Sequence, residues 1–255
     1  MRVVLARGVI QRCLFVAYRL DPDVAQGLLP PPLRTRLING YAVAGIVLAR
    51  LGRLRPVGLP AVGGLTRESA THGVAVEWES ARALHTGVYI LHRDRGVPTG
   101  DSPAASTSAT AVTGLGRRLH RPAQFTVDER TDGLRVAYTS RDRAVQLEID
   151  VSLATSLMGS ALFPDVPTAA RFFELDGSSD GWRPDVRGLR LTAEDRCLGA
   201  AHITTARSSI LADASRFPHG SVQLDSALLC RDVAVSWAPA ERVRAARRAA
   251  APSLA

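Results

Sequence analysis

The sequence contains no lysine. All 32 residues of the lysine-plus-arginine total are arginines, and against 24 acidic residues they give a net charge of +8. Because arginine keeps its proton at working pH, no side chain here can form the imine that lysine forms with a carbonyl compound. The absence excludes a mechanism that uses a lysine imine. A codon bias that replaces lysine by arginine and enriches alanine, as in residues 245–255, is the simplest cause of this composition.

Cysteine is scarce as well. Cys13, Cys197 and Cys230 lie far apart in the sequence, with no spacing typical of zinc ligands or of a disulfide framework. Buried, reduced thiols in a cytoplasmic protein are the plain interpretation. We therefore expect no bound metal and no cofactor.

Long uninterrupted apolar runs are missing too. Four arginines interrupt the apolar first 20 residues: Arg2, Arg7, Arg12 and Arg19. This segment therefore lacks the continuous apolar core of a signal peptide or of a membrane span. We expect no membrane partner and a cytoplasmic location.

Aromatic residues make up only 5% of the chain, which bears on the meaning of its positive charge. The arginines are scattered, and the densest group, from Arg242 to Arg248, lies near the C-terminus. No strand alternates basic and aromatic residues in the way that base-stacking surfaces do. We therefore predict a small-molecule partner rather than a nucleic acid. The sequence leaves a homo-oligomer open.

The sequence does contain enough hydrophobic residues to form a buried core. Of its 255 residues, 46% are hydrophobic and 22% are charged, as in globular proteins. No internal repeat and no linker divides the chain. We expect a single domain over residues 1–240, followed by a basic, alanine-rich tail over residues 241–255.

Turn and capping residues place the first elements. Asp21 followed by Pro22 predicts the start of a short helix that ends before the prolines at 30–32. Asn39-Gly40 and Asp132-Gly133, each between apolar runs, predict two hairpins. The glycine- and proline-rich residues 51–65 are interpreted as an ordered loop.

Strand patterns dominate the rest of the chain. Residues 145–151 alternate apolar and polar side chains, as a half-buried strand does. Further strands are expected over residues 13–20, 74–78, 87–92, 189–191, 200–206 and 233–237, with a short helix over residues 169–175. Residues 101–119 indicate either a helix or a flexible lid. The fold class is therefore α+β, mainly antiparallel β and barrel-like, with a few short helices.

Several segments resemble a known family. They are residues 29–31, 39–43 and 55–60, and above all the late segment 208–232 with its Arg216-Phe217-Pro218-His219-Gly220 run. These segments resemble the uncharacterised YqjF-like proteins (DUF2071) of the acetoacetate decarboxylase superfamily, over about residues 14–237. The resemblance implies an acetoacetate decarboxylase-like fold, a cone-shaped barrel of curved antiparallel sheets around an internal pocket.

The resemblance also implies where catalysis would occur. Decarboxylases of the superfamily carry a reactive lysine pair after a Gly-aromatic-Pro turn, and Ala123 and Gln124 stand at the similar place here. Neither residue can form an imine. Glu68 and Glu77 look equivalent to carboxylates of the superfamily's pocket, and Glu68 is the better match.

The strand pattern suggests further catalytic candidates. Glu77 and Glu79 share one strand face, opposite Trp78, so an outward-packed apolar face would point both carboxylates into the barrel. A desolvated pair would then provide an acid beside a base. The alternative is a solvated face with its carboxylates paired to arginines. His92, at the end of the adjoining strand, and His72, in the loop before residue 74, are proton-relay or structural histidines.

Arg118, His120 and Arg121 precede the place of the absent lysines. A guanidinium group there could bind a carboxylate or an enolate, or it could simply lie at the surface. Trp78 and Gln124 complete the expected substrate-binding set with Arg118 and His120. Ser208 lacks the Gly-x-Ser-x-Gly elbow of a nucleophile, so a hydrogen-bonding role is expected.

Two functions remain open at this stage. The first is a cofactor-independent lyase, cyclase or isomerase, acting in specialised metabolism on a carbonyl- or enol-containing small molecule. Its acid/base set would be Glu68, Glu77, Glu79 and His92. The second is a non-catalytic protein that binds or sequesters a small molecule in the same barrel.

Overall fold

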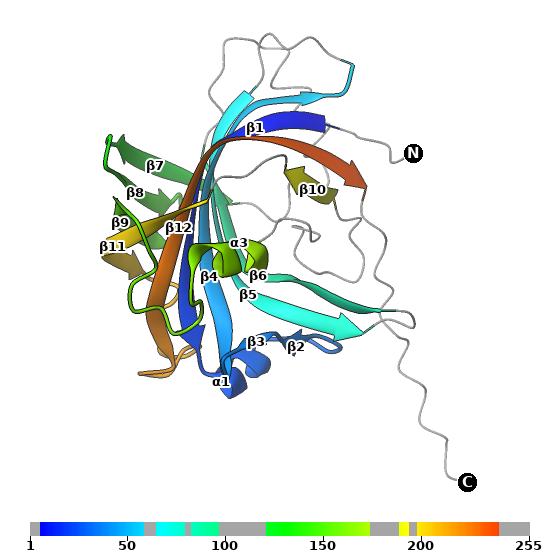
Figure 1. Ribbon diagram of the computed structural model, residues 1–255, viewed down its shortest axis with the longest axis vertical. Helices are drawn as coiled ribbons and strands as arrows, with labels where there is room; N and C mark the ends of the chain where they lie inside the picture. The colour runs from blue at the N-terminus through cyan, green and yellow to red at the C-terminus, as the bar shows by residue number, and fades with distance from the viewer. Residues whose placement is uncertain are drawn as a thin grey trace.

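The computed structural model describes residues 6–58, 65–79, 83–96, 121–173, 189–193 and 198–239 of the chain. These residues form one 12-stranded sheet and two short helices (Figure 1). The elements are β1 (Ala6–Leu20), α1 (Pro22–Gly27), β2 (Arg34–Thr35), β3 (Leu37–Ile38), β4 (Tyr41–Pro56), β5 (Leu65–Glu79), β6 (Leu84–Arg95), β7 (Arg121–Glu129), β8 (Gly133–Ser140), β9 (Gln146–Ala154), α3 (Val166–Phe172), β10 (Leu189–Ala193), β11 (Gly199–Ser208) and β12 (Val222–Pro239).

The sheet closes on itself. Its order runs β5-β6-β7-β8-β9-β11-β12-β1-β4, and β4 pairs again with β5. Two joins in this ring are short, because β6 and β7 share only two residue pairs and β11 and β12 share only three. The β6–β7 join is parallel, whereas the other pairings are antiparallel. This barrel-like, mainly antiparallel architecture confirms the predicted fold class.

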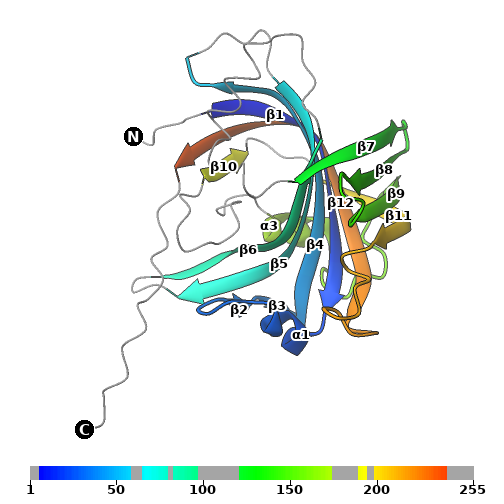
Figure 2. The same cartoon turned by 180° about the vertical axis from the view of Figure 1, so that it is seen from behind.

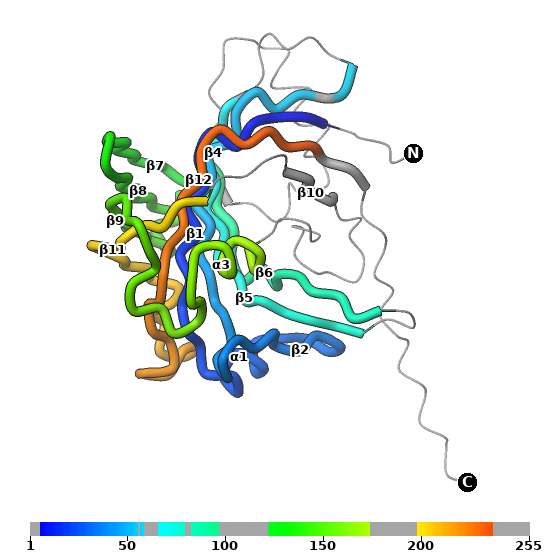
Figure 3. Tube along the Cα trace, viewed as in Figure 1, coloured from blue at the N-terminus to red at the C-terminus, as the bar shows by residue number. Residues whose placement is uncertain are grey.

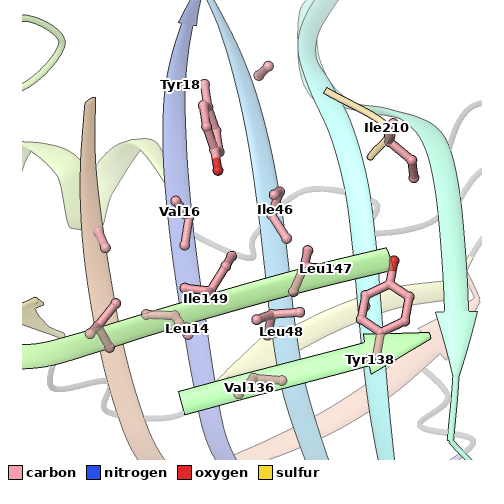
Figure 4. Close-up of a cluster of buried hydrophobic side chains, with 14 of the residues drawn as sticks. Leu14, Val16, Tyr18, Ile46, Leu48, Val136, Tyr138, Leu147, Ile149 and Ile210 are labelled. Atoms are coloured by element: carbon pink, nitrogen blue, oxygen red, sulfur yellow. The ribbon is translucent and has the colours of Figure 1, made fainter. Parts of the chain in front are cut away.

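Long and short strands form two layers. β7, β8, β9 and β11 lie to one side of the long, bent strands β1, β4, β5 and β12, as both views show (Figures 1 and 2). Aliphatic side chains fill the space where β8 and β9 cross β1 and β4, with Leu14, Ile46, Val136 and Ile149 among them (Figure 4). All four side chains are essentially inaccessible to solvent. Burying such groups is the main favourable term in folding.

The long strands are covered on both faces. From residue 13 to residue 18 the side chains of β1 alternate between the interior core and a second cluster outside the ring. The segment around Leu162 and Phe163, together with α3, packs onto that outer face of β1, β4 and β12 (Figure 3). A strand buried on both faces needs apolar residues at consecutive positions, which explains the unbroken run from Cys13 to Tyr18.

The predicted turns and cap are confirmed. Asn39 and Gly40 have φ values of 50° and 82° and join β3 to β4, as the favoured two-residue hairpin requires. β7 and β8 form the second hairpin, with Asp132 and Gly133 at its turn. The side chain of Asp21 accepts hydrogen bonds from the backbone N–H groups of Asp23 and Val24 at the start of α1.

The cap makes a simple stability prediction. Asp21→Ala is expected to lower the free energy of unfolding by about 1 kcal/mol, because two N–H groups lose their acceptor. Urea denaturation measures this change. Asp23→Ala removes a carboxylate from the same turn without removing a capping bond, so it should cost less. Equal losses in the two variants would contradict a capping role for Asp21.

Strand lengths were predicted less well. β4 continues to Pro56 and β5 begins at Leu65, so much of the predicted loop at 51–65 is strand. His72, expected in a loop, lies in the middle of β5 opposite His92. The prediction was wrong because residues 66–72 are polar, and polar residues normally favour loops. Here Glu68 and His72 find partners inside the ring.

Some predictions lie outside the described residues. They include the helix or lid at 101–119, with Arg118 and His120, and the tail at 241–255. The single-domain boundary therefore stays a prediction. In the part of the chain that the structure describes, no helix is both long enough and apolar enough to cross a membrane.

Candidate functional site

The interior face of β5 carries the polar residues of the site. Because side chains alternate along a strand, Glu68, Ala70, His72 and Val74 point to the same side. Ala70 and Val74 belong to the interior core, and His72 is fully buried. Glu68 and His72 therefore face the inside of the ring, which agrees with the position expected for Glu68.

Arg12 of β1 is the central residue of the first polar group. Its side chain is 1% exposed. Its Nη2 donates to Glu68 Oε1 at 2.7 Å, and its Nε donates to Glu129 Oε1 at 2.9 Å. Arg50 Nη1 lies 3.8 Å from Glu68, and Arg231 Nη1 donates to Glu129 Oε2 at 2.7 Å. We call these five residues the Arg12 cluster.

The Arg12 cluster crosses the barrel. Arg12, Glu68 and Glu129 come from β1, β5 and β7, which are not paired with one another in the sheet. An irregularity in the β1–β4 pairing falls between Ile10 and Arg12. Ile10 belongs to the outer cluster, whereas Arg12 reaches two interior carboxylates. Such bulges redirect side chains, and this one places Ile10 on the outer side, whereas Arg12 keeps the interior side of Leu14.

The two carboxylates bound to Arg12 differ in their electrostatics. Burial raises the pKa of Glu68 above its usual value, although the charges of Arg12 and Arg50 oppose the change. Burial would also raise the pKa of Glu129, but hydrogen bonds from Arg12 and Arg231 outweigh it, so this pKa is lowered. Glu68 thus holds a proton more readily than Glu129. Two carboxylates that differ in this way can serve as acid and as counter-ion.

One amino group of the Arg12 guanidinium donates no hydrogen bond to the described residues. Nη1 is buried and has no hydrogen-bond partner among the described residues. Buried donors in native structures are nearly always satisfied, and an exception calls for an explanation. A guanidinium N–H inside the barrel is well suited to an anionic oxygen of a guest molecule.

Two histidines form the centre of a second polar group. His92 Nε2 lies 2.6 Å from Asp94 Oδ2, and His72 Nε2 lies 3.0 Å from Ser208 Oγ. The two imidazole rings meet edge to face, with centroids 6.2 Å apart. Tyr138 of β8 stacks on Phe125. We call His72, His92, Asp94, Tyr138 and Ser208 the His92 cluster.

Burial sets the protonation of this cluster. Desolvation, followed by the charge of His92, lowers the pKa of His72 to about 3, so His72 is neutral in working conditions. Burial and then the charge of Asp94 raise the pKa of Tyr138 well above its usual range, so its hydroxyl keeps its proton. The cluster therefore offers a neutral imidazole and a phenol rather than two charged groups.

Small residues lie between the two groups. Ala70 is on β5 between Glu68 and His72, and Ala123 is buried on the interior face of β7. Gly96 lies so close to Glu68 and Phe125 that an added Cβ would be 3.2 Å from one and 3.3 Å from the other. Ala123, at the place where the resemblance implies a lysine, thus faces the interior but carries no amine.

Of the two alternatives that the sequence left open for Glu77 and Glu79, the structure shows the solvated one for Glu79. The apolar face of β5, including Val76 and Trp78, faces inward, so Glu77 and Glu79 lie on the opposite face. Glu79 is 66% exposed and pairs with Arg34 at 2.7 Å, which is the solvated alternative. Trp78 is buried and stacks on His85. These carboxylates do not form a desolvated pair.

The structure also describes two other predicted site residues, Gln124 and Ser208. Gln124 is exposed on the outer face of β7, since its neighbours Ala123 and Phe125 point inward. Ser208 accepts a backbone hydrogen bond besides its contact with His72, in keeping with the hydrogen-bonding role expected for it. Within the described ranges, no group of three histidine, cysteine or acidic residues is arranged to hold a metal ion.

Six residues of the two clusters were not predicted from the sequence: Arg12, Arg50, Glu129, Arg231, Asp94 and Tyr138. Arg12 carried a usable signal, because an arginine beside the apolar run 13–18 is unusual. Glu129 and Tyr138 lie far from their partners in the sequence, and only the fold brings them together. No local pattern distinguishes them from surface residues of a hairpin.

Comparisons with known proteins place the fold. No protein-family model matches the chain, and no curated protein matches its sequence. Among solved structures, acetoacetate decarboxylase from Legionella pneumophila aligns with a TM-score of 0.54 and 12% identity, over 93% of this chain and 87% of its own. An acetoacetate decarboxylase-like enzyme from Sphingomonas wittichii RW1 aligns with a TM-score of 0.53 and 11% identity, over 94% of each chain.

A third similar structure is a biosynthetic enzyme. The enduracididine biosynthesis enzyme MppR, complexed with the condensation product of pyruvate and imidazole 4-carboxaldehyde, aligns with a TM-score of 0.51 and 14% identity. That alignment covers 94% of this chain and 90% of MppR. At such identities a structural likeness shows the fold and not the chemistry. The protein therefore has the acetoacetate decarboxylase-like fold, built from a sequence that contains no lysine.

Proposed function

We propose that this protein is a cofactor-independent enzyme that acts on a carbonyl- or enol-containing small molecule by acid/base chemistry, as a lyase, cyclase or isomerase. The observation that carries the proposal is Arg12. It is fully buried, it holds two carboxylates whose pKa values are shifted in opposite directions, and its Nη1 has no partner in the described part of the chain. A buried cation with a spare N–H suits an oxyanion that forms during proton transfer.

The residues of the Arg12 cluster have distinct roles in this proposal. Arg12 Nη1 donates to the carboxylate or enolate oxygen of the substrate. Glu68, whose pKa is raised by burial, delivers or takes the proton, as a carboxyl group with a raised pKa can do near neutral pH. Glu129 stays charged and balances the guanidinium group.

The similar structures support the substrate class. MppR was captured with pyruvate and with a condensation product of pyruvate, and two other neighbours are decarboxylase-type enzymes. Acetoacetate and pyruvate are both carbonyl compounds. Because this chain has no lysine, the proposal replaces an imine by hydrogen bonds to an enolate.

Proton exchange in deuterium oxide tests the proposal. The protein should accelerate the exchange of the methyl protons of pyruvate, followed by proton NMR. Glu68→Gln should slow this exchange by at least about 100-fold, because it removes the acid/base group. Glu79→Gln is the matched control and should leave the rate unchanged, since Glu79 lies at the surface. Unaccelerated exchange, or an undiminished rate in Glu68→Gln, would contradict the proposal.

A reduction experiment tests the absence of an imine. Treating the protein with pyruvate and borohydride should leave the mass of every side chain unchanged, because none carries an amine. Peptide mass spectrometry reads the result, with a lysine-dependent aldolase as the positive control. A reduced adduct on a side chain would remove the basis of the proposed chemistry.

A non-catalytic binding protein is the second candidate. The aliphatic core between β8, β9 and β1, β4 favours it, since it provides an apolar environment next to the polar clusters (Figure 4). Native mass spectrometry of the protein purified from its host separates the two functions. An unaltered, retained ligand together with no proton exchange would support binding alone.

A further inference from the structure

The His92 cluster contains three buried polar atoms that the proposed function has not used. His72 Nδ1, Asp94 Oδ1 and the Tyr138 hydroxyl oxygen have no hydrogen-bond partner among the residues that the structure describes. All three belong to residues that are at most 3% exposed. Unsatisfied buried groups cost roughly 1–3 kcal/mol each, so three in one neighbourhood need a physical reason.

The three atoms gather around His92. Asp94 contacts His92 directly, and the His72 ring lies edge to face with it. After burial, the charge of Asp94 and a hydrogen-bonding interaction with its carboxylate raise the pKa of Tyr138, so the phenol and this carboxylate are close. Their contact does not have the geometry of a hydrogen bond, so both oxygens can still take a partner. Figure 4 shows the Tyr138 hydroxyl directed toward Ile210 and away from Val136. Residues of β5, β6 and β8 therefore present their polar atoms to one interior region.

The Asp94 contact selects the tautomer of His92. A carboxylate oxygen at 2.6 Å accepts the Nε2–H, so in the neutral imidazole the lone pair is on Nδ1. This is the arrangement in which a carboxylate orients an imidazole base. The neutral state of the buried His72 leaves no second charge beside this base.

The unsatisfied oxygens define what would bind. Tyr138 keeps its hydroxyl proton and offers a donor, whereas Asp94 Oδ1 offers an acceptor. A guest that satisfies both presents a carbonyl oxygen to Tyr138 and a hydroxyl group to Asp94. An α-hydroxy carbonyl compound has these two groups on neighbouring carbons.

We infer that His92, Asp94 and Tyr138 form a second proton-transfer site, for an α-hydroxy carbonyl compound, which goes beyond the proposed function because that function uses Glu68 of the Arg12 cluster. His92 Nδ1 takes the proton from the carbon next to the carbonyl group, so a C–H bond breaks and an N–H bond forms. The electron pair becomes the C=C bond of an enediolate, whose oxygen accepts a hydrogen bond from Tyr138. Returning the proton to the same carbon completes an exchange. Returning it to the former carbonyl carbon completes an isomerisation, in which the proton of the hydroxyl group moves to the former carbonyl oxygen, so no other reactant is needed.

Hydroxyacetone and methoxyacetone are the probes, because they differ only in the hydroxyl group that Asp94 would accept. In deuterium oxide, wild-type protein should exchange the α-protons of hydroxyacetone at least tenfold faster than those of methoxyacetone, relative to buffer. His92→Gln and Tyr138→Phe should each slow the hydroxyacetone reaction by about 100-fold. His202→Gln, which changes an exposed histidine of β11, should have no effect. Equal rates for the two probes, or undiminished rates in His92→Gln, would overturn the inference.

Asp94 acts through His92, so its test needs a spectroscopic measurement. Nitrogen-15 NMR of the full chain should show His92 protonated at Nε2 and unprotonated at Nδ1. Asp94→Asn should change this tautomer, whereas a merely structural Asp94 would leave it unaltered in a folded variant. Loss of the His92 resonances in His92→Gln assigns the signals.

The outcomes separate this inference from the proposed function. Pyruvate exchange that depends on Glu68, with no exchange of hydroxyacetone, would leave the proposed function standing and overturn the inference. No exchange of any probe would overturn both. An Nδ1-protonated His92 would overturn the inference whatever the rates are.

Discussion

Replacing Arg12 by methionine is expected to lower the free energy of unfolding by about 3–5 kcal/mol. The reason is that removing one partner of a buried ion pair leaves the other charge uncompensated in the protein interior. Arg12 is 1% exposed and is the shared donor to Glu68 and Glu129. Urea denaturation at neutral pH measures the loss. The effect should be the largest of any single substitution in the polar clusters.

The matched control is Arg231→Met. Arg231 also binds Glu129, but its side chain is 37% exposed, so its removal should cost less than about 1 kcal/mol. Combining Arg12→Met with Glu68→Gln should recover part of the lost stability, because the unpaired carboxylate is then neutral. A similar small loss in Arg12→Met and Arg231→Met would show that Arg12 is not the electrostatic centre of the barrel.

Acidification should destabilise the protein through His72. Its pKa is about 3 in the folded protein and 6.5 when the ring is solvated, so the unfolded chain binds the proton more tightly. Stability from this group is therefore fully present above pH 6.5 and is lost as the pH falls from 6.5 toward about 3. The limiting contribution is on the order of 5 kcal/mol, at about 1.4 kcal/mol for each pH unit.

Urea denaturation between pH 7 and pH 4 tests this prediction in wild type and in His72→Gln. The variant is less stable at pH 7, since it loses the contact with Ser208, but its stability should fall less steeply with acid, by one bound proton. His219→Gln, at an exposed position, should keep the wild-type slope. Glu68 acts in the opposite sense, because its raised pKa favours the folded state at low pH. It is common to all three proteins and cancels in the comparison. Identical slopes in wild type and His72→Gln would contradict a neutral, buried His72.

The helix cap, the hairpin turns and the buried positions of a strand were predictable, because short-range hydrogen bonding and backbone geometry determine them. Asp21 caps α1, and Asn39-Gly40 turns the β3–β4 hairpin, because both follow from hydrogen bonding and from positive φ within a few residues. The alternation in β9 predicted the buried positions Leu147, Ile149 and Val151. Each of these predictions depends on neighbours in the sequence.

The direction of a strand face was not predictable in the same way. Alternation along β5 separates Glu77 and Glu79 from Trp78, but it does not say which side becomes the interior. The aliphatic layer from β8 and β9 decided this by covering the face that carries Glu68 and His72. Glu68 therefore lies inside the ring, whereas Glu79 lies at the surface, and the catalytic role predicted for Glu68 stays a prediction.

By itself, the sequence determined that no side chain can form an imine, that the chain is rich in antiparallel strands, and where its clearest turns lie. These properties depend on residue types and on short-range backbone geometry. Only the tertiary structure decided that Arg12 would meet Glu68 and Glu129, and that Asp94 would contact His92 within reach of Tyr138. The physical reason is that ring closure brings β1, β5, β6, β7 and β8 together across the barrel. Burial there sets the proton affinities, and burial is a property of the assembled fold rather than of any segment.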